Sequence, residues 1–143
     1  MKYIIILAIS LLLNLTGCAI FTTYDSKEMA EIKMQQAAFI SKDLLSLMTE
    51  LYGPGQTAFI FEYKPALLGN TLEQHLRQAG YSVYNHAATA HHKAVALFYI
   101  IDNFPDNTLR VGVTLGHYKI TRLYQQQGEN LAPASGFTLT RLE

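Results

Sequence analysis

The chain has 143 residues, of which 11 are Lys or Arg and 11 are Asp or Glu, so its formal net charge is zero. A near-neutral chain lacks the clustered positive charge with which proteins bind nucleic acid, and we expect no direct nucleic-acid contact. Half of the residues are hydrophobic and only one is a cysteine. No intramolecular disulfide can form, so an apolar core must hold the fold together. This length suits one domain.

The first eighteen residues, MKYIIILAISLLLNLTGC, have the layout of a secretory signal peptide. Lys2 supplies a positive amino-terminal region, Ile4 to Leu13 is an almost continuous apolar run, and small residues follow it. The run is shorter than the roughly 20 residues of helix that cross a bilayer core. The pattern therefore favours a cleaved signal over a transmembrane span.

The only cysteine, Cys18, directly follows Leu15, Thr16 and Gly17. These four residues resemble a bacterial lipobox, in which the cysteine thiol receives a diacylglycerol and a peptidase cuts just before the cysteine. The resemblance implies a signal peptide over residues 1–17 and a covalent diacylglycerol and N-acyl lipid on Cys18, with no other cofactor. The alternative is a buried free cysteine, but burial gives the thiol no reason to follow a signal peptide.

The residues after the lipobox indicate where the protein would be anchored. Ala19 stands where Asp would signal retention in the inner membrane, so the resemblance to enterobacterial lipoproteins implies the outer membrane. Two or more acyl chains anchor a protein stably. Residues 18–25 would form a lipidated tether whose last seven residues reach at most about 25 Å. We therefore expect one domain, residues 26–143, to face the periplasm close to the membrane.

A long helix is predicted over residues 26–51. Ser26 is in a suitable N-cap position, and the sequence YGPG from Tyr52 ends the helix. Apolar residues recur at mostly three- and four-residue steps: Met29, Ile32, Phe39, Ile40, Leu44, Leu47, Met48 and Leu51. The methionines would suit an adaptable docking stripe, but a core-facing stripe is the preferred interpretation.

The remaining elements predict an α+β fold. A strand is expected over 56–63, with Phe59 and Phe61 on one face, and a second helix over 66–79 with Gly80 as its C-terminal cap. Further strands are expected over 81–85, 95–102, 109–116, 118–126 and 137–142. We expect the two helices to pack on one face of a mainly antiparallel sheet of four to six strands.

No residue pattern indicates catalysis, and we expect the protein not to be an enzyme. His86, His91 and His92 gather in one segment, but polar loop histidines are the preferred interpretation because no cysteine or acid accompanies them. Asp102 and Asp106 are better interpreted as turn formers than as a catalytic carboxylate pair. We predict no metal site.

Nine tyrosines and seven phenylalanines leave two interpretations open. The strand face that carries Tyr118, Ile120, Arg122 and Tyr124 would suit a protein interface, since aromatic residues are enriched at interface cores. An ordinary core with amphipathic edges is the preferred alternative.

The carboxy-terminal segment LRVGVTLGHYKITRLYQQQGENLAPASGFTLTRLE resembles the signature of the TrbH family, small lipoproteins of conjugative plasmid transfer. Its middle segment LRQAGYSV, residues 76–83, and the lipobox fit the same family. Two positions depart from the pattern, since Phe137 stands in place of a tryptophan and Ser135 is an extra residue. The signature positions are Thr114, Gly116, Thr121, Arg122, Tyr124, Leu131, Ala132, Pro133 and Gly136.

The resemblance implies a structural subunit of a type IV secretion apparatus, engaged in mating-pair formation at the outer membrane. It implies the channel-ring proteins of the transfer system as partners, a ring-like homo- or hetero-oligomer, and attachment to the membrane through the lipid. The alternatives are a periplasmic lipoprotein that acts as a pilot or binding module for another envelope complex, and a lipid-anchored envelope enzyme.

Overall fold

The computed structural model describes residues 25–87 and 93–143. The predicted signal peptide and lipobox, nearly all of the tether, and His91 and His92 lie outside the described residues. The elements in chain order are β1 Lys27–Glu28, α2 Met34–Leu51, β2 Ala58–Phe61, α3 Leu67–Gln78, β3 Ser82–Tyr84, β4 Val95–Phe104, β5 Thr108–Leu115, β6 Tyr118–Gln127, β7 Asn130–Pro133 and β8 Thr138–Arg141.

The strands form one mixed sheet in the order β3-β2-β4-β5-β6-β7, with β1 paired to β4 and β8 paired to β6. The α+β class and the two helices on a sheet are confirmed, and the described residues form eight strands. Strands β4, β5 and β6 are antiparallel neighbours joined by tight hairpins, whereas β2 lies parallel to β3 and β4. Parallel pairing of β2 and β3 follows from the helix α3 between them, since parallel strands need a crossover connection.

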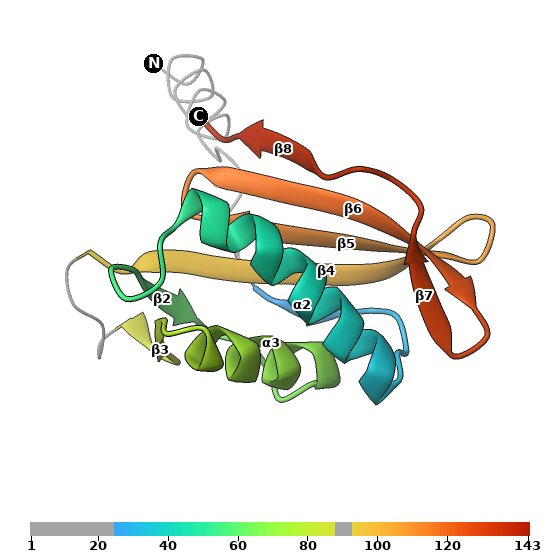
Figure 1. The fold of residues 1–143 in the computed structure, drawn as a ribbon, viewed down its shortest axis with the longest axis horizontal. Helices are drawn as coiled ribbons and strands as arrows, with labels where there is room; N and C mark the ends of the chain where they lie inside the picture. The colour runs from blue at the N-terminus through green and yellow to red at the C-terminus, as the bar shows by residue number, and fades with distance from the viewer. Residues whose placement is uncertain (1–24, 88–92) are drawn as a thin grey trace, which may run out of the picture.

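Both helices cover the same face of the sheet (Figure 1). The face beneath them is built by strict alternation along β5, whose Leu109, Val111, Val113 and Leu115 are fully buried. Three residues of the predicted stripe on α2 meet this face with no exposed surface: Ile40, Leu44 and Met48. Burial of these three residues confirms the core interpretation for the centre of the stripe, whereas Met29 and Phe39 are exposed.

The opposite surface of the sheet is called the open face below. Among the described residues, no helix lies on it (Figure 1). Since side chains alternate between the two faces of a strand, the register of β4, β5 and β6 assigns the following residues to the open face: Ile100, Asp102, Arg110, Gly112, Thr114, Lys119 and Thr121.

The predicted start of the first helix at Ser26 is wrong, because the helix begins at Met34. Lys27 and Glu28 instead form β1, which pairs with Ile100 and Ile101 in the central strand. The Ser26 hydroxyl accepts a hydrogen bond from the Tyr99 amide at 3.2 Å and caps nothing. Long-range pairing has therefore overridden a local helical pattern, and Met29 is left exposed.

Helix α2 is capped later in the chain than the sequence predicted. Its N-cap residue is Lys33, whose amide donates to Gln36 Oε1 at 2.9 Å. A glutamine three residues into the helix satisfies in this way an amide that the helix itself leaves free. Gln36, three residues after Lys33, is thus a capping signal that the sequence contains.

Fully buried Leu44 gives a direct test of the core beneath α2. We expect Leu44→Ala to lower the free energy of unfolding by about 3 kcal/mol, because it removes buried apolar volume and leaves a cavity. The exposed Ser46→Ala on the same helix is the control and should change stability by less than about 0.5 kcal/mol. Urea unfolding of the purified proteins measures both, and equal midpoints for the two variants would contradict this packing.

Candidate functional site

The signature residues do not form one pocket; they are distributed over both faces of the carboxy-terminal strands. Arg122 and Tyr124 lie on the helix-covered face of β6, and Thr114 and Thr121 lie on the open face. Leu131, Ala132 and Pro133 belong to β7, a strand that the sequence analysis missed. Its Leu131 is buried against the core.

A charged network connects α2 to the signature residues of β6. The Tyr124 hydroxyl donates to Asp43 Oδ2 at 2.7 Å, and Arg122 Nη1 lies 3.2 Å from the same oxygen. The Arg122 and Asp43 side chains are only 15% and 20% exposed, so the pair is largely shielded from water. Asp43 thus fixes the helix over the sheet at two signature positions.

Aromatic rings enclose this network. The Arg122 guanidinium lies 4.1 Å from the centre of the Phe137 ring, and Phe39 meets Tyr124 edge-to-face at 6.2 Å. A guanidinium over an aromatic face is attracted by the ring quadrupole. Phe137, which replaces the expected tryptophan, therefore still provides the ring on which Arg122 stacks.

Ser135, the extra residue of the signature, has a definite role in the sheet. Strand β8 pairs with β6 up to Thr121, and β7 pairs with β6 from Tyr124 onward. In the interval between them, the Leu123 amide donates to Ser135 Oγ at 3.0 Å, and the Ala134 amide donates to the Leu123 carbonyl at 2.8 Å. Ser135 therefore satisfies a backbone amide where one edge strand ends and the next has not begun.

Gly116 is required at the β5–β6 hairpin. Its φ of 54° lies in the left-handed region, and its amide donates to the Ala96 carbonyl at 2.9 Å. A Cβ at this position would lie 3.2 Å from Val95 Cγ1 and 3.3 Å from the Tyr52 hydroxyl. Gly136, by contrast, has no atom within 4 Å of such a Cβ, and nothing in the structure explains its choice.

A second polar cluster holds the start of the domain. Glu28 Oε1 accepts the amides of Leu68 at 2.5 Å and Gly69 at 3.3 Å, in the first turn of α3, and the Tyr99 hydroxyl at 3.2 Å. A carboxylate is stabilised at a helix N-terminus by the free amides there. Gly69 allows the close approach, because a Cβ there would lie 2.4 Å from Tyr63 Cδ2. The residues next to the predicted tether are thus attached firmly to α3 and β4.

The other candidate residues take structural positions. Asp102 pairs with Arg110 across β4 and β5, and Asp106 lies in the β4–β5 loop with a φ of 60°. His86 is exposed. Within residues 25–87 and 93–143, no group of His, Cys, Asp and Glu side chains is arranged to hold a metal ion. In the same residues no helix is long and apolar enough to cross a membrane.

The face with Tyr118, Ile120, Arg122 and Tyr124 is covered by the chain itself. Ile120 and Tyr124 have no exposed surface, and Tyr118 packs edge-to-face against Tyr52 at 6.4 Å. The core interpretation of this face is therefore confirmed, and the interface interpretation is wrong.

We expect the shielded Asp43–Arg122 pair and the exposed Lys33–Glu129 pair to differ markedly in their contribution to stability. Asp43→Asn should lower the free energy of unfolding by about 2 kcal/mol, because it leaves the shielded Arg122 cation without its counter-charge. Glu129→Gln disrupts the exposed pair with Lys33 and should have no measurable effect. Chemical unfolding at neutral pH measures both, and an Asp43→Asn variant as stable as Glu129→Gln would contradict the assigned role.

We expect the domain to lose stability in alkali because of Tyr124. Burial, and then the hydrogen bond to Asp43, raise the pKa of its hydroxyl above the usual value. The folded state therefore binds this proton more tightly than the unfolded state. The resulting stability is complete below the ordinary tyrosine pKa of about 10 and falls as the pH rises above it. Urea midpoints across this range should fall less steeply in Tyr124→Phe than in the natural protein; equal slopes would contradict the prediction.

A comparison with known families identifies the chain. The model of the family described as "Conjugal transfer protein TrbH" matches residues 20–143, which include the whole described fold. No curated protein and no solved structure matches the chain. Because the family match spans most of its length, the chain belongs to the TrbH family of conjugal transfer proteins.

Proposed function

We propose that the protein is an outer-membrane lipoprotein and a structural subunit of a conjugative type IV secretion apparatus. Membership of the TrbH family makes it a conjugal transfer component. That match is the observation that carries the proposal. The lipobox at Cys18 and the residue Ala19 support the lipid anchor and the outer membrane.

The attachment of the domain to its tether fits an anchored subunit. Residues 18–24 precede the first described residue, and Ser26 to Glu28 are then bonded to β4 and α3. From Cys18 to Asp25 the chain extends at most about 25 Å. A domain held this closely would stay beside the inner leaflet of the outer membrane, where the channel-ring proteins assemble.

The polar groups at the edges of the core hold the elements of the domain together. The carboxylates of Glu28, Asp43 and Glu73 each bind groups on a neighbouring element or at the end of one. The proposed role requires no chemistry from them. It requires a rigid body with surfaces to which other subunits bind, and many copies in a ring would strengthen weak single contacts by avidity.

Deletion of the gene tests the proposed function. The deletion should abolish plasmid transfer without affecting growth, and a copy expressed in trans should restore transfer. Transfer at the normal frequency in the deletion strain would contradict the proposal. If the protein serves a different envelope complex as a pilot or binding module, the deletion would impair that complex instead.

Cys18→Ser tests the anchor separately. Serine cannot form the thioether to diacylglycerol, so the variant should accumulate as an uncleaved, unacylated precursor and should fail to restore transfer. Mass spectrometry of the membrane fraction measures the processing, and Ser26→Ala, beyond the tether, is a control that should be processed normally. A Cys18→Ser protein that is cut after Gly17 and retained in the outer membrane would show that the lipobox assignment is wrong.

A further inference from the structure

The open face of the sheet contains a hollow of about 220 Å³. Its lining residues are Ile100, Arg110, Gly112, Lys119 and Thr121, which come from three adjacent strands. The volume is below the roughly 300–1,000 Å³ typical of pockets for free small molecules, but it accommodates a protein side chain. The hollow therefore favours an inserted side chain over a small-molecule ligand.

One residue that lines this hollow is a glycine in the middle of a strand. Gly112 is paired without a bulge to Ile100 on one side and Thr121 on the other. A Cβ at position 112 would lie 3.1 Å from Ile100 Cγ2, so a side chain there would displace Ile100 from its place in the lining. A glycine in a strand interior without a bulge is typical of a place where a ligand or another chain approaches the backbone closely.

The charges around the hollow are predominantly positive. Arg110 and Lys119 line it, and Asp102 is the carboxylate that pairs with Arg110. In the described part of the chain, Lys119 is exposed and makes no ion pair. Within residues 25–87 and 93–143, the Lys119 charge at the hollow therefore has no carboxylate partner.

Arg110 is held in position for a further contact. Its Nε donates to Asp102 Oδ1 at 3.0 Å, and its guanidinium lies 5.6 Å from the centre of the Phe104 ring. Asp102 binds one edge of the guanidinium, and the Arg110 side chain remains 45% exposed. Since a guanidinium carries five N–H donors in a rigid plane, the others stay available to an acceptor from outside.

We propose that the hollow on the open face binds a carboxylate side chain, Asp or Glu, from a neighbouring protein of the transfer apparatus. The acid would lie between Arg110 and Lys119, with the Thr121 hydroxyl as a further donor. Ile100 beside the hollow and the exposed ring of Phe104 would contact apolar residues that flank the acid. This docking role rests on the proposed function, because it takes its partner from the same apparatus.

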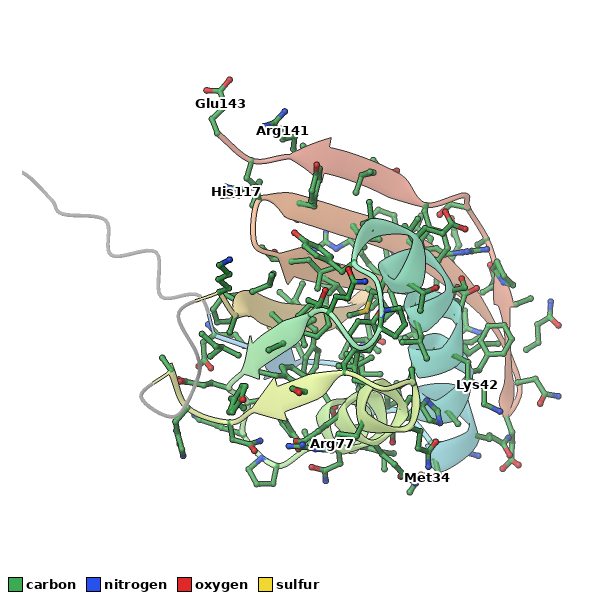
Figure 2. All side chains as sticks on the ribbon, turned by 60° about the vertical axis from the view of Figure 1, so that its left-hand side comes forward. Met34, Lys42, Arg77, His117, Arg141 and Glu143 are labelled. Atoms are coloured by element: carbon green, nitrogen blue, oxygen red, sulfur yellow. The ribbon has the colours of Figure 1, made fainter. Side chains whose placement is uncertain are left out.

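Charge reversal in the deletion strain tests the docking role. The gene is returned as the natural form, Lys119→Glu, Lys119→Arg or Lys42→Glu, and the transfer frequency is measured. Lys42 is the matched control, an exposed lysine on α2 (Figure 2). We expect Lys119→Glu to reduce transfer about tenfold or more, because a like charge would face the incoming acid. Lys119→Arg keeps the positive charge and should retain more transfer than Lys119→Glu, whereas Lys42→Glu should transfer normally.

The outcomes separate this inference from the proposed function. Normal transfer with Lys119→Glu, in a system where the deletion abolishes transfer, would overturn the docking role and leave the structural role intact. An equal loss with Lys42→Glu would also overturn it, because the effect would not belong to the hollow. Thermal unfolding of each variant checks that the exposed substitutions leave the fold intact.

Site-specific crosslinking identifies the partner directly. A photoreactive amino acid placed at Thr114, which is on the open face next to Lys119 but does not line the hollow, should crosslink to a protein of the transfer apparatus, and the same group at Glu50 on α2 should not. An Asp→Lys or Glu→Lys change in the crosslinked segment should restore transfer to Lys119→Glu. Crosslinks to lipid alone, or a failure of every acid in that segment to rescue, would overturn the proposal.

Discussion

Burial of one face of the sheet beneath the two helices is the constraint on which the rest of the structure depends. The alternation of β5 places four apolar side chains on that face, and the stripe of α2 covers them. Both helices lie on this face, so the polar and mixed residues of β4, β5 and β6 are left on the other. The division of the sheet into a core face and an open face thus follows directly from the sequence pattern.

The polar contacts fix how the helices lie on the core face, but they do not determine which face is the core face. Asp43 joins α2 to Arg122 and Tyr124 at one side of the core, and Glu28 joins β1 to α3 and Tyr99 at the other. Each carboxylate connects elements that are distant in the chain, so each favours one placement of a helix over the sheet. The signature residues fall on both faces, since Tyr124 and Leu131 are buried in the core whereas Thr114 and Thr121 are half-buried on the open face.

The sequence was sufficient for features determined locally and insufficient for those determined by distant partners. The strand alternation of 109–115, the stop at Gly80 and the buried stripe of α2 each depend on neighbours in the chain. The strand β1 was missed because its residues continue a helical pattern and become extended only by pairing with β4. The strand β7 was missed because it is short and contains Pro133, which is unfavourable in a strand. The role of Asp43 was missed because no local pattern indicates a partner about eighty residues away.

The pairing of β1 with the middle of the sheet has a mechanical consequence. A pull on the amino terminus would act first on Lys27 and Glu28, which are bonded to the central strand and, through the Glu28 carboxylate, to the first turn of α3. Tension would therefore enter the domain at its core and not at a peripheral strand that could peel away. The domain can therefore bear a load on its amino terminus without first losing its outer strands.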